Sequence, residues 1–322
     1  MKYNNKLVFA PAGLGRLNFA RSSLRFTAPQ QKRYMPVLNG VYVKFKKYNA
    51  LGNSYLVIEE NPESDLSEEA ISIICSQNFG IGSDGILLKS KSSSSCDFGL
   101  RIFNPDGSEA EKSGNGIRIF CRYLFDNGLV GNERFTVLTK GGTVNCQILG
   151  SGSRVVVEMG TAVFNAESIP VLNVSGEVIN KDIVINGEEI VFSSVSMGNP
   201  HCVIFADDPS KSLACRLGPL IENQSIFPNR TNVQFVKVIN RNLIEIEIWE
   251  RGAGYTLASG SSSCAAAAVA KKLGYCDSEI IVRMPGGEIE IKIDENNTVT
   301  MEGSVVSVCS GIVSIEALAQ CI

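Results

Sequence analysis

Two Ser-Gly pairs have the residue types and the surroundings to bind an anion. Ser113-Gly114 and Ser259-Gly260 lie 146 residues apart, and each precedes a segment whose small and apolar residues favour a helix. A helix N-terminus offers unpaired backbone N–H groups and a partial positive charge, which together bind anions such as a carboxylate. Two such ends facing one cleft could hold both carboxylate oxygens of an amino acid. Serine is also a preferred N-cap, so either pair alone is more simply a structural cap.

Longer strings around the two pairs carry a specific resemblance. The first runs from Asn104-Pro105-Asp106-Gly107-Ser108-Glu109 to Ser113-Gly114-Asn115-Gly116-Ile117-Arg118, and the second from Glu250-Arg251-Gly252-Ala253-Gly254 to Ser259-Gly260-Ser261. Further matching strings follow the same order: Leu51-Gly52-Asn53, Phe79-Gly80-Ile81-Gly82, Met197-Gly198-Asn199-Pro200-His201 and Arg230-Thr231-Asn232-Val233. From about Val41 to the C-terminus, the chain resembles the diaminopimelate epimerase family.

The resemblance implies a cofactor-independent amino-acid epimerase or racemase, which needs neither a metal nor pyridoxal phosphate. The family converts LL- into meso-diaminopimelate in lysine biosynthesis: one cysteine thiolate removes the α-proton and a second thiol reprotonates the opposite face. Carried over by position, these catalytic roles fall on Ser113 and Ser259. The residues implied to hold the substrate are Asn53, Asn104, Gly114, Asn115, Asn199, Asn232, Glu250, Arg251, Gly260 and Ser261, with His201 beside the site.

Serine at both cysteine positions is the main departure from the family. A thiol has a pKa near 8.5, which a helix N-terminus lowers, whereas a serine hydroxyl is far less acidic. Each pKa unit corresponds to about 1.4 kcal/mol, so the change could slow proton abstraction by many orders of magnitude. Other departures predict a changed distal end of the pocket: Asn49, Ser54, Gly85, Tyr255, Ser262 and Ser263.

Three interpretations remain open at this point. The chain could be an isomerase in which another residue or water moves the proton, and the serines act as polar groups. It could be a weak or inactive relative that binds an amino acid, or an ordinary epimerase whose two cysteines have been replaced by serine. The retention of Glu250, Arg251 and His201 favours the isomerase.

The elements that position these residues are those of an α/β protein. Alternating or compact apolar runs predict strands at 41–45, 55–58, 86–88 and 98–103, several short ones at 135–159, and others near 189–206 and 232–249. Helices are expected after Ser67, over Ile117 to Asp126, and over Cys264 to Leu273. The resemblance implies two pseudo-symmetric domains, each a mixed or antiparallel β-barrel-like sheet around a central helix, with the site in the interdomain cleft.

Chain length and the two Ser-Gly pairs predict the domain limits. We expect an N-terminal domain over 41–158 and a C-terminal domain over 159–322, whose last strand could return to the first domain. The leader 1–40 contains no acidic residue and includes arginines and serines, so we expect an organelle transit peptide, a disordered extension or the product of an upstream start-codon artefact. We therefore expect a cytoplasmic protein, or an organellar one if the leader is a targeting signal.

Composition excludes several other classes of function. A net charge of -3 gives no argument for nucleic acid or an acidic membrane as partner, and no apolar run approaches the ~20 residues of a membrane span. The ten cysteines form no Cys-x-x-Cys pair and lie mostly in apolar stretches, which predicts buried reduced thiols rather than zinc ligands. The expected partner is a small-molecule amino acid, with a homodimer as an option.

Overall fold

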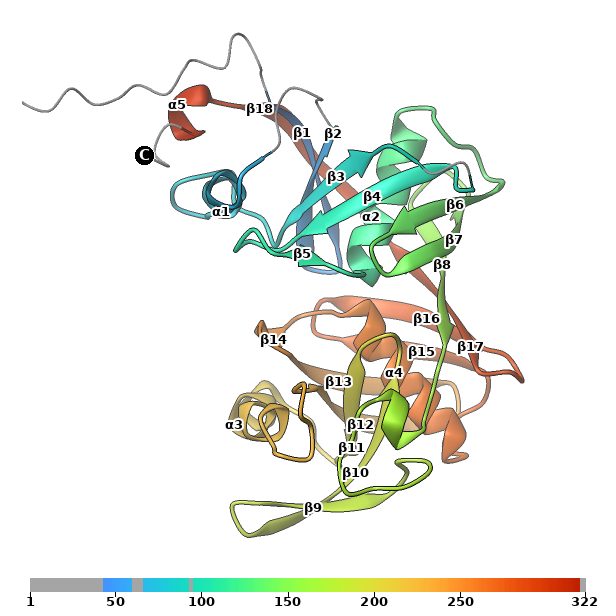
Figure 1. Ribbon diagram of the computed structural model, residues 1–322. Coiled ribbons are helices and arrows are strands. Elements are labelled where there is room, and N and C mark those ends of the chain that lie inside the picture. The colour runs from blue at the N-terminus through green and yellow to red at the C-terminus, as the bar shows by residue number, and fades with distance from the viewer. Residues whose placement is uncertain (1–42, 60–65, 93–94, 319–322) are drawn as a thin grey trace, which may run out of the picture. The chain divides into compact units, whose positions relative to one another are not determined.

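The computed structural model describes residues 43–59, 66–92 and 95–318 (Figure 1). The leader and the first two residues of the strand expected at 41–45 lie outside these ranges, as does Cys321. No helix among the described residues is long and apolar enough to cross a membrane.

Strands make up most of the regular structure, and each half holds a long helix. The first half consists of β1 (Val43–Ala50), β2 (Asn53–Glu59), α1 (Glu68–Cys75), β3 (Ile86–Ser90), β4 (Phe98–Phe103), β5 (Glu109–Ala110), α2 (Gly114–Asp126), β6 (Arg134–Thr139), β7 (Gly142–Leu149) and β8 (Arg154–Thr161). The second half consists of the 3-10 turn Ala166–Ser168, β9 (Lys181–Ile185), β10 (Glu188–Ser196), β11 (Pro200–Phe205), α3 (Lys211–Glu222), β12 (Asn232–Asn240), β13 (Leu243–Glu250), β14 (Gly254–Thr256), α4 (Gly260–Lys272), β15 (Glu279–Met284), β16 (Gly287–Ile293) and β17 (Thr298–Ser304). The chain then continues through β18 (Val306–Val313) to α5 (Ile315–Leu318).

The strands pair in both directions, and two pairings connect distant parts of the chain. Parallel pairs join β2 to β3, β4 to β6, β11 to β12 and β13 to β15, whereas the other pairs are antiparallel. Strand β17 pairs with β8, and β18 pairs with β1, so the last strand lies beside the first described one (Figure 1). This mixed α/β architecture of two similar halves confirms the predicted fold class. The boundary predicted between residues 158 and 159 falls within β8, and the division into 41–158 and 159–322 stays a proposal.

The central helices α2 and α4 are covered by the strands of their halves. Strands β1, β2, β7 and β8 pack on α2, and strands β10 to β13 and β15 to β17 pack on α4 (Figure 1). In α2 the buried side chains of Ile117, Phe120, Cys121 and Leu124 follow helical spacing. In α4 half of the buried residues are alanines, which let the surrounding strands approach the helix closely. Both helices contribute to one continuous hydrophobic core.

Both central helices begin earlier than predicted. Helix α2 starts at Gly114 rather than Ile117, and α4 starts at Gly260 rather than Cys264. The reason is the cap: the side chains of Ser113 and Ser259 accept hydrogen bonds from backbone N–H groups of the first turn. The segments 114–116 and 260–263, which precede the expected helices, are therefore the first turns of the helices.

Helix α3 was not identified from the sequence. It begins after the N-cap Ser210 and buries Ala214, Leu217 and Ile221 against β12 and β13. Pro219 lies inside the helix, and this proline obscures the helical pattern.

The described cysteines match the expected reduced thiols. All nine are free, and seven are buried, while Cys215 and Cys309 are exposed. Among the described residues no group of three or more His, Cys, Asp or Glu side chains could hold a metal ion.

Candidate functional site

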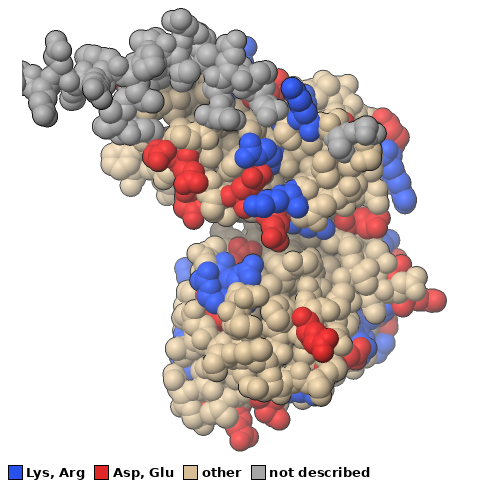
Figure 2. Space-filling model, viewed as in Figure 1, with Lys and Arg blue, Asp and Glu red and all other residues tan. Residues whose placement is uncertain are grey.

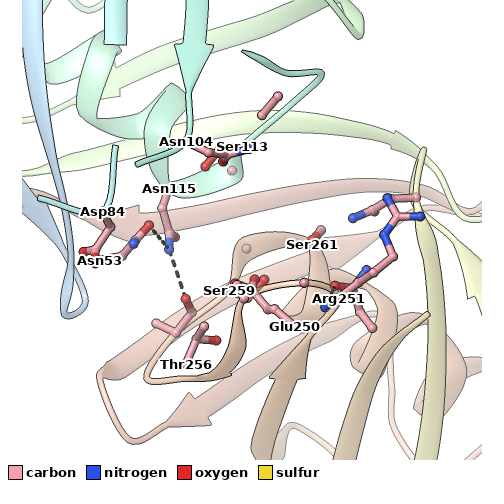
Figure 3. A pocket seen from close by; sticks show the side chains of 18 of the residues that line it. Asn53, Asp84, Asn104, Ser113, Asn115, Glu250, Arg251, Thr256, Ser259 and Ser261 are labelled. Carbon is pink, nitrogen blue, oxygen red and sulfur yellow. Dashed lines mark hydrogen bonds between the residues drawn. The ribbon is translucent and has the colours of Figure 1, made fainter. Parts of the chain in front are cut away.

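A cavity of about 990 Å³ opens where the first turns of α2 and α4 meet. Its walls include the twelve residues predicted to hold or transform the substrate: Asn53, Asn104, Ser113, Gly114, Asn115, Asn199, Asn232, Glu250, Arg251, Ser259, Gly260 and Ser261. Figure 3 shows residues of both halves facing this cavity, and Figure 2 shows acidic and basic side chains on both sides of the hollow between the halves. Residues that are far apart in the sequence therefore line the same cavity in the fold.

The two helix ends touch through their glycines. A Cβ atom placed on Gly114 would lie 3.2 Å from the Cα atom of Gly260 and 2.8 Å from Cε of Met301. The absence of a side chain at both positions therefore allows the backbones to approach. Because each end carries a partial positive charge and free N–H groups, the junction is suited to a carboxylate.

Ser113 contacts a buried phenol. Its Oγ accepts a hydrogen bond from the Gly116 N–H at 3.1 Å and lies 3.3 Å from the hydroxyl oxygen of Tyr55. Burial raises the pKa of Tyr55 to about 12, and the hydrogen bond with Ser113 opposes the rise. The Tyr55 hydroxyl is therefore protonated at neutral pH and can donate to Ser113.

Ser259 contacts a carboxyl group. It is buried, caps α4 by accepting from the Ser262 N–H at 3.5 Å, and lies beside the side chain of Glu250 (Figure 3). Burial raises the pKa of Glu250 above its ordinary value, and the interaction with Ser259 opposes the rise. Each serine therefore has a titratable partner: a phenol for Ser113 and a carboxyl group for Ser259.

Asn115 links the two halves across the junction. Its Nδ2 donates to Oδ1 of Asn53 and to the carbonyl oxygen of Ala258, both at 3.1 Å (Figure 3). Residue 258 directly precedes the cap of α4, so one amide of α2 fixes the entrance to the other helix. This side chain is buried and positions the helix ends relative to each other.

On the second half, asparagines orient the rest of the wall. Asn232 donates from Nδ2 to the Pro200 carbonyl at 2.9 Å, and its Oδ1 accepts from the Arg251 N–H at 2.9 Å. His201 does not line the cavity, and its ring is fully buried. Its Nε2 atom lies within hydrogen-bonding distance of Oδ1 of Asn199, at 2.9 Å. Burial lowers the pKa of His201 to about 3, so the imidazole is neutral at physiological pH and cannot serve as a charged acid there.

Several cavity residues were not predicted from the sequence. They are Tyr55, Asp84, Lys112, Arg230 and Thr256, together with turn and backbone positions near the two Ser-Gly pairs. Tyr55 had a usable signal, because it lies two positions after Asn53 in a strand and therefore faces the same side. Lys112 donates to the Met159 carbonyl at 2.8 Å, and burial lowers its pKa.

The chain is similar to known proteins over most of its length. The family model "Diaminopimelate epimerase" matches residues 45–165 and 193–308. Diaminopimelate epimerase 2 of Nostoc sp. is 55% identical over 280 residues, covering 86% of this chain and 98% of that protein. Diaminopimelate epimerase of Methanothermobacter thermautotrophicus is 39% identical over 280 residues, covering 84% and 98%.

Solved structures of low sequence identity share the fold. A probable proline racemase from Agrobacterium radiobacter, solved with bound carbonate, has a TM-score of 0.64 at 14% identity, covering 85% of this chain and 93% of that one. A methylitaconate-delta-isomerase has a TM-score of 0.59 at 9% identity, covering 86% and 97%. By its family match and its similarity to relatives over nearly their whole length, the chain belongs to the diaminopimelate epimerase family of isomerases.

Proposed function

We propose that this protein is a cofactor-independent epimerase or racemase of an amino acid related to diaminopimelate. The observation that carries the proposal is the pair of serine-capped helix ends, which meet at one cavity from opposite halves. The substrate carboxylate binds at the helix ends, and the α-carbon lies between Ser113 and Ser259. The named asparagines, Glu250 and Arg251 hold the remaining polar groups.

In the proposed reaction the serines relay protons to and from stronger acids and bases. The Cα–H bond breaks as the α-proton moves to Oγ of Ser259, whose own proton passes to the Glu250 carboxylate. The opposite face of the carbanion takes the proton of Ser113, which is replaced from the Tyr55 hydroxyl. One proton is removed and one delivered, after which Glu250 returns its proton and Tyr55 regains one through solvent. The contacts of the two serines with Glu250 and Tyr55 support this route.

The direct test follows the α-proton by NMR. The purified full chain is incubated in D2O with LL- and meso-diaminopimelate, L-lysine, L-glutamate and L-alanine, and loss of the α-proton signal is measured alongside chiral chromatography. We expect exchange and stereochemical inversion for at least one amino acid without added cofactor. Binding without any exchange across the panel would contradict the proposal.

A second function is supported by the serines themselves. An amino-acid-binding protein without catalysis would keep the helix-end cradle and lose both thiols, as this chain does. Calorimetry on the same panel separates the two functions: tight binding with no exchange favours the binding protein, and binding with exchange favours the epimerase.

The wider setting of the protein is also proposed. A cytoplasmic location fits lysine biosynthesis, with an organellar location if residues 1–40 are a transit peptide. A homodimer is the proposed assembly. Fractionation of cells expressing a tagged chain, and light scattering on the purified protein, test these two statements.

A further inference from the structure

A buried arginine lies behind the junction of the two helix ends. Arg118 is on α2 and its side chain is fully buried. Its Nη1 lies 3.4 Å from Sδ of Met301, the side chain that also packs against Gly114 and Gly260. A Cβ atom on Gly303 would lie 2.9 Å from Nε of Arg118, so a glycine of β17 closes over the guanidinium.

This guanidinium has no acidic partner among the described residues. None of the ion pairs in that part of the chain includes Arg118, and its Nε has no hydrogen-bond partner there. Burial lowers its pKa to about 10, which still leaves the group charged at neutral pH. A buried charge without a counter-ion is costly, so an anion that completes the site would be bound more tightly.

Asn115 connects this charge to the cavity. Nη2 of Arg118 donates to Oδ1 of Asn115 at 2.8 Å. With its Oδ1 held by Arg118, the Nδ2 group of Asn115 points to Asn53 and to the Ala258 carbonyl. The orientation of this amide, and with it the junction of the two helix ends, therefore depends on the guanidinium.

We propose that Arg118 is the positioning residue of the carboxylate cradle: it fixes Asn115 and supplies the buried positive charge that a ligand carboxylate neutralises. The inference rests on the proposed function, which places a carboxylate at the helix ends, and it assigns to Arg118 the buried charge that makes this site select an anion. The α-carboxamide of the same amino acid, which is neutral at that position, is therefore a poor ligand.

The experiment measures discrimination between the two forms of ligand. Calorimetry on the full chain at neutral pH compares lysine with lysinamide and glutamate with its α-amide, isoglutamine. The wild type should bind the carboxylate form roughly tenfold or more tightly, the range that a charge-assisted buried contact produces. Arg118→Met should bring the two affinities close together, and Arg118→Lys should restore part of the discrimination because it keeps the charge.

Arg122 is the matched control. It lies one turn further along α2, forms an ion pair with Asp126 at 2.8 Å and is not part of the cavity wall. Arg122→Met should lower the melting temperature while leaving the discrimination unchanged. A general loosening of α2 would weaken both forms of ligand alike, so it would not reproduce the effect expected of Arg118→Met.

Three results would overturn the inference, and two of them need no variant. A wild type that binds carboxamide and carboxylate within about threefold of each other, or that binds neither form of either pair, contradicts it even if Arg118→Met fails to fold. The inference is also contradicted if the wild type and a folded Arg118→Met variant prefer the carboxylate form over the carboxamide form by the same factor. The proposed function is judged separately by α-proton exchange. Preference for the carboxylate form without α-proton exchange supports the role of Arg118 and contradicts the epimerase. Exchange without that preference supports the epimerase and contradicts the role of Arg118.

Discussion

At the scale of single residues, the hydroxyl groups of Ser113 and Ser259 limit which groups can move a proton. A hydroxyl at position 113 or 259 is a poor base by itself, and the structure places a phenol beside one serine and a carboxyl group beside the other. The helix ends that would acidify a thiol are still present at both positions. The site therefore has helix ends that would lower the pKa of a thiol, and it also offers a phenol and a carboxyl group that can carry a proton.

Restoring both thiols should raise the rate of α-proton exchange. The double variant Ser113→Cys plus Ser259→Cys should gain at least about tenfold over wild type, because a thiol is several pKa units more acidic than a hydroxyl. Either single variant should gain much less, since each face of the α-carbon needs its own acid or base. NMR in D2O with the full panel measures the rates. If the wild type exchanges the α-proton rapidly and keeps its rate after both serines are changed to alanine, Ser113 and Ser259 are not the catalytic pair.

Glu250→Gln should reduce exchange by about a hundredfold or more, the size expected for loss of a general base. The pKa of Glu250 is raised, so in the wild type the active carboxylate form is lost as pH falls through that raised value. Exchange should therefore decline at a higher pH than for an ordinary carboxyl group, and the decline should be absent in Glu250→Gln. A wild-type rate that stays constant between pH 8 and pH 4 would contradict the assignment.

The residues of the site were predictable where the motif strings name them, and less so where only packing does. Asn53, Asn115 and Glu250 lie inside motif strings that are specific to the diaminopimelate epimerase family. Arg118 stands inside the first string too, yet its lack of an acidic partner depends on β17 closing over it, which no local pattern reveals. Tyr55 is similar: its contact with Ser113 spans 58 positions of the chain.

At the scale of elements, the starts of the two central helices were harder to predict than their ends. Glycine and serine have low helical propensity, so the sequence predicts helices that begin only at Ile117 and Cys264. The caps Ser113 and Ser259, together with burial of both first turns, override this propensity. The cradle thus consists of helical backbone N–H groups rather than of loops.

Gly114→Ala should separate the two helix ends. The added methyl group would approach Gly260 Cα to 3.2 Å, and that backbone atom cannot rotate away as the Met301 side chain can. We expect amino-acid affinity to fall by tenfold or more, with a loss of unfolding free energy of about 1–3 kcal/mol. Calorimetry and urea titration measure the two effects. Ser210→Ala is the control: it removes the N-cap of α3 at a cost of about 1 kcal/mol and should not change affinity. Unchanged binding in Gly114→Ala would contradict the close-approach argument.

At the scale of the whole molecule, the two halves are joined by backbone pairing as well as by the site. Strand β17 pairs with β8 over seven residue pairs before the chain returns through β18 to β1. The hydrophobic core continues from α2 to α4. We therefore expect residues of the second half to influence the unfolding of the whole described chain, and buried His201 provides a test.

Acid should destabilise the protein through His201. Its pKa is about 3 when folded, because burial disfavours the charged ring and Arg251 acts in the same direction, against an ordinary value of 6.5. Between these values the unfolded chain binds a proton that the folded chain does not, so stability falls as pH decreases, by about 1.4 kcal/mol per pH unit. The pKa values of Asp97, Asp106 and Asp294 are lowered, and these carboxylates add losses of the same sign at still lower pH.

The contribution of the histidine is measured by comparing a variant with the wild type between pH 6.5 and pH 4.5, before Asp97, Asp106 and Asp294 titrate in the folded protein. The titration of Glu250, whose pKa is raised, is common to both proteins and cancels in the comparison. His201→Gln should be less stable than wild type at pH 7, because it disturbs the buried contact with Asn199. It should also lose stability more slowly on acidification, so that the two curves converge by about 1.4 kcal/mol per pH unit. Urea unfolding at half-unit pH steps gives both curves. If they stay parallel through this window, the folded ring takes up its proton at an ordinary pH, and the neutral, buried His201 that holds Asn199 is excluded.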